Sequence, residues 1–285
     1  MTVRQAVLGG VKQLEARVET PFLDAVILFS SASGWSKERV LASYPEEISE
    51  QLEETYKKML AQRMDGTPVS YIRGKKEFYS LEFSVGPGVL VPRPETEILV
   101  DAVINLADKN PGIRSVHDTC TGSGCVAISI KNANPDLTVS ASDISPVAAS
   151  FFKDNCSALL GEEIPFFESD LLASVNGAFD VITANPPYIT SDQYAKMVRD
   201  HWPEPAIALD GGVDGLEFYR KLIPMSASRL TQNGFLLLEA DSSQFEAIRK
   251  MFVQNGFQTT ILYKDLTGRN RVICGNLGTG SEWKI

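Results

Sequence analysis

The stretch SVHDTCTGSGCVAISI, residues 115–130, joins a short apolar segment to a helical one through a turn that holds two glycines. A glycine turn between a strand and a helix lets a ligand approach the backbone closely, because glycine carries no side chain. Gly122 and Gly124 fit that use. The pattern alone is weak evidence, since an ordinary tight turn also contains glycine.

Segments with strand-like and helix-like patterns alternate around this turn. Strands are expected at 114–118, 137–142, 165–168, 179–184, 234–240, 257–263 and 270–274. Helices are expected between the first five strands and before the sixth, which predicts a mostly parallel sheet covered on both faces. Only KDLTGRN separates the last two strands, which is too short for a parallel crossover, so we expect them to pair antiparallel.

The region before the sheet has a different pattern. Residues 1–75 are expected to form a small helical domain, because apolar residues recur at helical spacing from Val3 onward. Pro21 opens a second helix, Ser36 caps a third, and a fourth begins near Pro45. Such a domain is typical of a substrate-docking module.

Two more boundaries follow from the pattern. Residues 76–95 contain EFYSLEFSV and a Gly-Pro-Gly turn, which predict a β-hairpin connector. Residues 96–285 then form the sheet domain.

Bulk composition disfavours several classes of protein. The chain has 285 residues and a formal net charge of −9, which disfavours a long nucleic-acid groove, so we expect no direct nucleic-acid contact. No apolar run reaches the roughly 18 residues of a membrane span, and the charged N-terminal segment is no signal peptide, so we expect a cytoplasmic location. The four cysteines form no CxxC pair and the only histidines are 117 and 201, so no metal site is expected.

Two other strand ends carry polar residues that suit a ligand. The second strand ends at Asp143, whose carboxylate can accept hydrogen bonds from ribose hydroxyls or cap the helix near Pro146; the sequence leaves both open. The fourth strand ends at Asn185. In a doubly wound sheet of order 3-2-1-4-5 the first, second and fourth strands are neighbours, so the glycine turn, Asp143 and Asn185 should share one rim.

The segment ANPPYI, residues 184–189, ends that fourth strand with two prolines, which cannot continue a ladder. A glycine turn with a ribose-binding acid is also found in dinucleotide dehydrogenases, but DTCTGSG is not GxGxxG and a dehydrogenase has no use for NPPY. The pattern resembles class I S-adenosylmethionine-dependent methyltransferases, where NPPY marks methyl transfer to an amide or amino nitrogen. The resemblance implies a Rossmann-like, seven-stranded sheet with an antiparallel last strand, and S-adenosyl-L-methionine as cofactor.

The NPPY residues suit that chemistry. An amide nitrogen is a poor nucleophile because its lone pair is delocalised into the carbonyl. Asn185 Oδ1 and the Pro186 carbonyl can accept its two N–H groups and aim it, and Pro187 biases residue 186 to an extended conformation. Tyr188 can lie against the flat amide and exclude water. Holding both reactants in a near-attack geometry contributes up to roughly 7–11 kcal/mol.

Further stretches resemble the release-factor glutamine methyltransferases (the HemK or PrmC type). They are TPVSYIRG (67–74), GVLVPRPETEILV (88–100), SASDISP (140–146), ESDLL (168–172), EPAIALDGGVDGLEFYRKLI (204–223), GFLLLEADSSQ (234–244) and DLTGRNRV (265–272). The resemblance implies methylation of N5 of the glutamine in the Gly-Gly-Gln loop of peptide-chain release factors. We expect those factors to be the partners and the chain to act as a monomer.

The resemblance also assigns residues. The cofactor is expected to contact Cys120, Thr121, Gly122, Ser123, Gly124, Asp143, Leu171 (beside the adenine) and Asn185. Substrate binding is expected from Asn185, Pro186, Pro187 and Tyr188, of which Asn185, Pro186 and Tyr188 are catalytic. Glu204 matches an EP motif near the site without an assigned role. Two departures stand out: the family usually has glycine at Cys120, and EADSSQ replaces an E-x-G pattern.

Three alternatives remain. A related ribosomal-protein glutamine methyltransferase is disfavoured by PRPETE at 92–97, an acidic pattern that those relatives tend to lose. A nucleic-acid amino-group methyltransferase, acting on adenine N6 or guanine N2, shares NPPY but is disfavoured by the acidic charge. An inactive methyltransferase fold that serves as a scaffold is possible because of Cys120.

Overall fold

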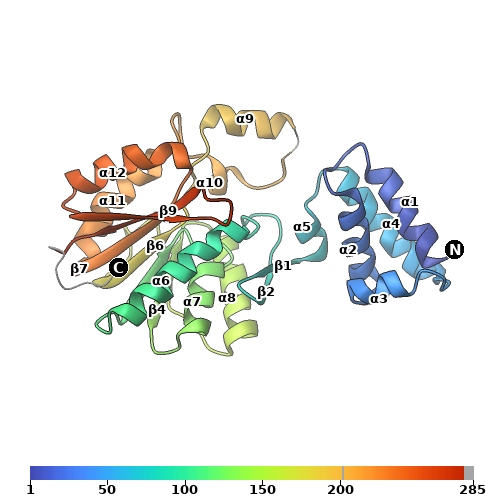
Figure 1. Ribbon diagram of the computed structural model, residues 1–285, viewed down its shortest axis with the longest axis horizontal. Helices are drawn as coiled ribbons and strands as arrows, with labels where there is room; N and C mark the ends of the chain where they lie inside the picture. Colours follow the sequence, from blue (N-terminus) through green and yellow to red (C-terminus); the bar gives the residue numbers. More distant parts are fainter. Residues whose placement is uncertain (201, 279–285) are drawn as a thin grey trace. The chain divides into compact units, whose positions relative to one another are not determined.

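The computed structural model describes residues 1–200 and 202–278; His201 lies outside the described residues. The chain divides into two compact units. One comprises Met1–Lys75 and the described part of Met197–Pro203, and the other comprises Lys76–Lys196 and the described residues from Glu204 on. The first unit is helical, and the second contains the hairpin and the main sheet (Figure 1).

The helical unit is built around one apolar core. Its helices are α1 (Val3–Leu14), α2 (Pro21–Ser33), α3 (Lys37–Ala42), α4 (Glu50–Met64) and α5 (Val69–Arg73). The helix starts at Pro21 and after Ser36 are as predicted, and Ser36 Oγ accepts the Arg39 N–H at 3.2 Å. The largest fully buried side chains are Leu14, Leu28, Phe29, Tyr56 and Leu60.

The predicted start of the fourth helix near Pro45 is wrong, because α4 begins at Glu50. Ser49 caps it, with Oγ accepting the Leu52 N–H at 3.2 Å. The residues just before it are extended instead, since the Val3 N–H donates to the Glu46 carbonyl at 2.9 Å and Thr2 pairs with Glu47. A long-range pairing with the chain's first residues has replaced a local helical turn.

The hairpin connector is confirmed as a two-stranded sheet of β1 (Lys75–Phe78) and β2 (Leu81–Ser84). Tyr79 and Ser80 form its turn with φ of 48° and 62°, the left-handed backbone that two-residue hairpins need. Glu97 Oε1 accepts the Tyr79 N–H at 2.8 Å and holds the turn. The strands are shorter than the predicted connector, because the backbone leaves β structure after Ser84.

The main sheet has the predicted topology. Its strands are β3 (Ser115–Thr119), β4 (Thr138–Asp143), β5 (Phe166–Glu168), β6 (Phe179–Ala184), β7 (Leu230–Glu239), β8 (Thr259–Lys264) and β9 (Asn270–Asn276). They lie in the order β5-β4-β3-β6-β7-β9-β8, and β9 runs antiparallel to both neighbours. The 3-2-1-4-5 order of the parallel strands and the Rossmann-like, seven-stranded fold are therefore confirmed.

Helices cover the sheet as Figure 1 shows. Helices α6 (Glu97–Lys109), α7 (Cys125–Ala133) and α8 (Pro146–Leu160) pack beside one another, and α11 (Glu217–Arg229) packs beside α12 (Phe245–Gln254). Shorter elements are η1 (Pro94–Thr96), α9 (Ser191–Arg199), α10 (Ala206–Leu209) and η2 (Ser242–Gln244).

The helix expected between the third and fourth strands is absent from the described chain. The segment between β5 and β6 is a series of turns, in which Ser169 Oγ accepts the Ser174 N–H at 2.9 Å. Leu171 interrupts any helix there with a left-handed φ of 52°. Its apolar residues still enter the core, since Leu172 and Val175 are buried.

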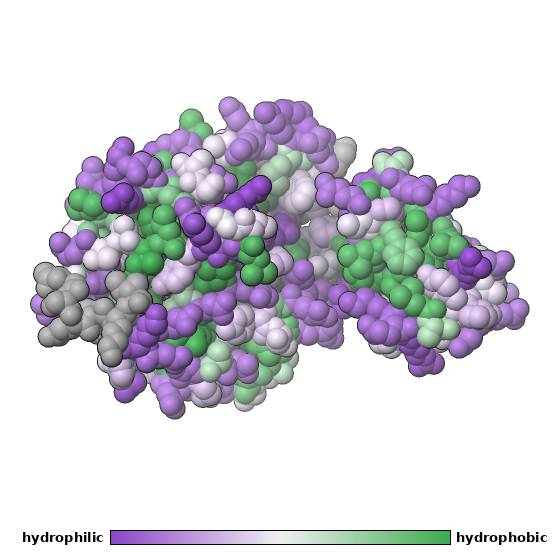
Figure 2. All heavy atoms as spheres, in the orientation of Figure 1, coloured by the Kyte–Doolittle hydropathy of each residue, from purple (hydrophilic) through white to green (hydrophobic). Residues whose placement is uncertain are grey.

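The surface of the helical unit is partly apolar. Figure 2 shows hydrophobic residues gathered on one of its faces among hydrophilic neighbours. The large hydrophobic side chains that this unit exposes include Leu8, Phe22, Leu23 and Leu41. Among the described residues, no helix combines the length and the apolar character that crossing a membrane requires.

Candidate active site

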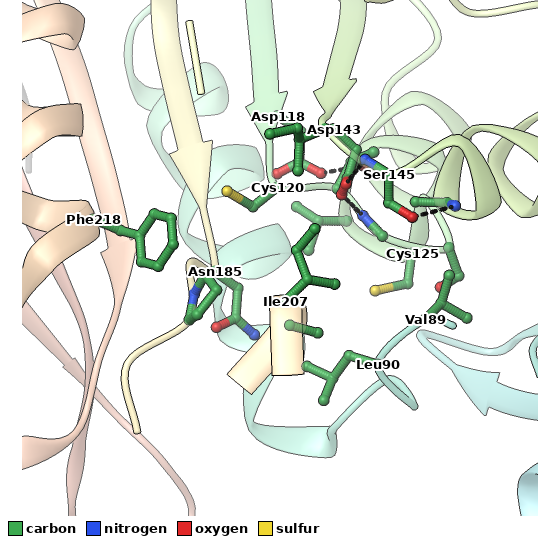
Figure 3. A pocket seen from close by; sticks show the side chains of 18 of the residues that line it. Val89, Leu90, Asp118, Cys120, Cys125, Asp143, Ser145, Asn185, Ile207 and Phe218 are labelled. Carbon is green, nitrogen blue, oxygen red and sulfur yellow. Dashed lines mark hydrogen bonds between the residues drawn. The ribbon is translucent and has the colours of Figure 1, made fainter. Parts of the chain in front are cut away.

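A cavity of about 270 Å³ lies at the carboxyl ends of β3, β4 and β6 (Figure 3). The strand ends that the sequence predicted to share a rim do meet there. The predicted site residues that line it are Cys120, Thr121, Gly122, Ser123, Asp143, Leu171, Asn185 and Pro187. Gly124, Pro186 and Tyr188 are not among the lining residues.

The two glycines of the turn after β3 have different surroundings and serve different structural purposes. Gly122 has φ of 56°, and a Cβ there would have no neighbour within 4 Å among the described residues, so the backbone faces open space. Gly124 has φ of 85°, and a Cβ there would lie 2.6 Å from a ring carbon of Phe152. Gly122 therefore leaves room beside a ligand, whereas Gly124 allows α7 and α8 to pack closely.

Two residues with side chains also adopt the left-handed backbone at this cavity. Cys120 has φ of 57° and Leu171 has φ of 52°. Each such conformation costs of order 1–3 kcal/mol and concentrates at functional sites. Burial raises the pKa of the Cys120 thiol, and the nearby carboxylates of Asp143 and Asp118 add to the effect. The thiol therefore stays protonated and is no nucleophile.

The cap of α8 is Ser145, whose Oγ accepts the Ala148 N–H at 3.3 Å. Asp143 joins two loops instead: Oδ2 accepts the Gly122 N–H and Oδ1 accepts the Ser145 N–H, both at 2.9 Å (Figure 3). A carboxylate has about four lone-pair sites, so two remain for a ligand. Burial raises the pKa of Asp143.

The sequence alone assigns no role to Asp118, although Asp118 lies in the stretch 115–130, just before the glycine turn. It is 2% exposed and accepts hydrogen bonds from Thr121 Oγ1 at 2.6 Å and Thr183 Oγ1 at 2.7 Å. Burial raises its pKa to about 6, against the lowering effect of the two hydroxyls. Asp118 thus fixes the glycine turn to β6 and places a carboxyl group at the cavity.

The NPPY turn is held from several directions. Asn185 Nδ2 donates to Thr96 Oγ1 at 3.2 Å. The Tyr188 side chain packs against the core cluster instead of lining the cavity, and its carbonyl accepts a hydrogen bond from Gln244 Nε2 at 3.0 Å. A Cβ on Gly215 would lie 2.3 Å from that same carbonyl oxygen. The turn therefore has little freedom to move.

Glu204, which had no role in the sequence reasoning, holds one wall of the cavity. It is 2% exposed, and its Oε1 accepts the Val91 N–H at 2.8 Å while Oε2 accepts a hydrogen bond from Arg93. Val89, Leu90 and Arg93 line the cavity. The hydrogen bond between Val91 and Glu204 joins residues 113 positions apart, so no local sequence pattern predicts it.

The rest of the lining is largely apolar. Ile207 and Phe218 lie around the same space as Asn185 and Asp143 (Figure 3), and Ile144 also lines the cavity. Ile144 and Ile207 are 47% and 51% exposed, which is unusual for isoleucine and leaves apolar surface for a ligand. An apolar slot beside a carboxylate suits a flat ring attached to a sugar. No group of three acidic, histidine or cysteine residues in the described ranges could hold a metal ion.

Two family models match separate parts of the chain. The model of the PrmC N-terminal domain matches residues 5–74, and that of the methyltransferase small domain matches residues 95–204. A methyltransferase structure from Pyrococcus furiosus aligns with a TM-score of 0.52 at 18% identity, covering 71% of this chain and 92% of that one, which supports the fold alone.

Curated relatives cover nearly the whole chain. The release factor glutamine methyltransferase of Moorella thermoacetica is 36% identical over 275 residues, which are 95% of this chain and 97% of that protein. The protein of the same name from Koribacter versatilis is 34% identical, over 98% of this chain and 100% of its own length. Since relatives at 34–36% identity align over 95–98% of this chain, the chain belongs to the release factor glutamine methyltransferase family.

Proposed function

We propose that this chain transfers a methyl group from S-adenosyl-L-methionine to the side-chain amide nitrogen, N5, of the glutamine in the Gly-Gly-Gln loop of peptide-chain release factors. The observation that carries the proposal is the position of Asn185, at one cavity with Asp143 and the glycine turn. The names of the curated relatives, at 34–36% identity, support the substrate.

The cavity residues fit the cofactor. The two free lone-pair sites of Asp143 can accept the ribose hydroxyls, and Ile144 and Leu171 can flank the adenine. The open space beside Gly122 leaves room for the rest of the cofactor. When bound, S-adenosylmethionine supplies an electrophilic methyl group on a positively charged sulfur. The carboxyl groups of Asp118 and Asp143 suit that charge.

Asn185 and Pro186 act on the substrate amide. Asn185 Oδ1 and the Pro186 carbonyl accept its two N–H groups, which turns the nitrogen toward the donor and strengthens its lone pair. The cofactor, held by Asp143 and the glycine turn, would supply the methyl group that this nitrogen accepts, and its sulfur would leave as a neutral thioether. The methylated nitrogen is then acidic and loses one proton to water. Tyr188 supports the turn through its carbonyl, which Gln244 holds at 3.0 Å.

The proposal includes a role for the helical unit and a cellular location. Residues 1–75 dock the release factor, which the match to a family-specific N-terminal domain supports. The enzyme acts as a monomer in the cytoplasm, where release factors work.

The test is transfer of a tritiated methyl group to three candidate substrates in parallel: a release factor, ribosomal proteins and nucleic acid. We expect label only on the release factor, and none on a release factor whose Gly-Gly-Gln glutamine is changed to alanine. Asn185→Ala should abolish transfer while cofactor binding partly survives. Label on the glutamine-free factor, or on another substrate instead, would refute the assignment.

A further inference from the structure

One side of α8 packs closely against the connector, and α8 lies beside β2 (Figure 1). Val147, Phe151 and Asn155 recur every four residues, so they lie on the same side of the helix. A Cβ on Gly88 would lie 2.7 Å from a methyl carbon of Val147, and a Cβ on Gly86 would lie 3.0 Å from a ring carbon of Phe151. The segment that leads from β2 to the cavity is therefore set by the surface of α8.

Asn155 joins that segment to the glycine turn, although its side chain is fully buried in α8. Its Oδ1 accepts the Ser84 N–H at 2.7 Å, and its Nδ2 donates to the Ser84 carbonyl at 3.1 Å. The same Nδ2 donates to the Ser123 carbonyl at 2.9 Å. One side chain thus holds the last residue of β2 and a residue of the glycine turn at the same time.

The two segments that Asn155 joins form different parts of the cavity lining. Residues 88–90 line it from the connector, and Gly122 and Ser123 line it from the glycine turn. Residues 85–93 and 120–124 lie outside helices and strands, so no ladder of backbone hydrogen bonds fixes them. Their positions depend on contacts such as those of Asn155.

The orientation of the Asn155 amide is fixed by its partners. A backbone N–H only donates and a carbonyl only accepts, so the three hydrogen bonds decide which atom of the amide is the oxygen. Both protons of Nδ2 are used, one on each segment. Because unsatisfied buried polar groups are costly, the two segments are held together as long as the amide stays in place.

We propose that Asn155 is a positioning residue, which couples the connector to the glycine turn and holds both at the spacing that S-adenosyl-L-methionine requires. The proposal rests on the cofactor-binding role of the cavity given above. Without the amide, both segments would occupy several positions, and the cofactor would bind only to the correct one. The apparent Kd then rises by the inverse of the populated fraction, so a fraction of about one tenth weakens binding about tenfold. Separate contacts with Thr96 and Gln244 hold the NPPY turn, so turnover at saturating cofactor should change little.

Asn276 offers a matched control near the amino end of β7, away from the strand ends that form the cavity. It is 3% exposed, and its Nδ2 donates to the carbonyls of Asn233 and Gly234 at 2.8 and 3.2 Å. Its Oδ1 accepts the Gly278 N–H at 2.9 Å. These four residues are not among those that line the cavity. Asn276 therefore makes the same three kinds of hydrogen bond as Asn155 in a different place.

The first test compares Asn155→Ala with Asn276→Ala in the full-length protein. Both changes remove one buried amide with three hydrogen bonds, so the urea midpoints of the two variants should fall by similar amounts. Calorimetry should show a Kd for S-adenosyl-L-methionine about tenfold weaker in Asn155→Ala and within about twofold of wild type in Asn276→Ala. The kcat for release-factor methylation at saturating cofactor should stay within about threefold of wild type in both. Equal Kd values in the two variants, or a loss confined to kcat, would overturn the positioning role.

A second measurement uses the wild-type protein and so does not depend on the folding of a variant. Coupling is reciprocal: if the Asn155 hydrogen bonds favour cofactor binding, the bound cofactor must favour those hydrogen bonds. S-adenosyl-L-methionine should therefore slow hydrogen exchange of the Ser84 N–H about tenfold and leave that of the Gly278 N–H, which Asn276 holds, unchanged. No slowing at Ser84, or equal slowing at both, would overturn the coupling. Slowing at Ser84 in a protein that labels no release factor would overturn only the proposed function.

Discussion

Replacing Gly215 by alanine should disturb the NPPY turn directly. Gly215 has φ of 71°, and an added Cβ would lie 2.3 Å from the Tyr188 carbonyl oxygen and 2.5 Å from Gln244 Nε2. Gln244 Nε2 donates to the carbonyls of both Tyr188 and Gly215, at 3.0 Å each. The new methyl group therefore cannot be accommodated unless this junction opens and the turn moves.

The chain offers a matched control for the size of the effect. Gly161, at the end of α8, has nearly the same φ of 69°, but a Cβ there meets nothing within 4 Å among the described residues. Gly161→Ala should cost only the left-handed backbone, about 1–2 kcal/mol of unfolding free energy. Gly215→Ala should add about 1–3 kcal/mol for overpacking, for a total of about 2–5 kcal/mol.

Urea denaturation of both variants measures the unfolding free energies, and methyl transfer to the release factor measures kcat at a temperature where both are folded. We expect Gly161→Ala to keep wild-type kcat and Gly215→Ala to lose at least about tenfold, because a displacement near 1 Å can cost about a hundredfold. Equal stability of the two variants, or full turnover by Gly215→Ala, would show that the junction does not position the turn.

Three other perturbations test separate parts of the structure. The Cys120→Gly variant should have an unfolding free energy about 1 kcal/mol higher than that of Cys120→Ala, because only alanine keeps a Cβ on left-handed backbone. Urea denaturation curves that coincide for the two variants would exclude backbone strain at Cys120. Burial lowers the pKa of His117 to about 4, so the unfolded chain binds a proton that the folded one does not. The unfolding free energy should thus fall by up to roughly 3 kcal/mol from His117 as the pH drops from about 6.5 to 4, and His117→Gln should lack that slope. Asp143→Ala should weaken cofactor binding by about 1.5–3 kcal/mol in calorimetry, and an unchanged Kd would limit Asp143 to joining the two loops.

The sheet could be predicted because its signal is local. Each strand is an apolar run bounded by turn residues, and the short link before β9 leaves only antiparallel pairing. The errors occur where distant contacts override local pattern. Glu46 and Glu47 pair with the start of the chain instead of beginning α4, and the left-handed Leu171 replaces a helix with turns.

The cavity rim could also be predicted, because the carboxyl ends of neighbouring parallel strands must meet. The residues that support the rim could not. Thr96 and Asn185 are 89 positions apart, and Val91 and Glu204 are 113 apart, so their contacts exist only in the folded chain. The sequence places Asp118 at the end of a predicted strand, but nothing in the sequence distinguishes a buried acidic residue from an exposed one.

The buried acids at this site explain why it would favour a cation over a neutral ligand. Burial raises the pKa of both Asp118 and Asp143, because their carboxylates lack the stabilisation that water would give them. A ligand with a positive sulfur compensates for that lack, and the attraction is strong because little water separates the charges. Methyl transfer turns the sulfonium into a neutral thioether and removes the attraction. The same carboxyl groups that favour the loaded cofactor therefore favour release of the spent one.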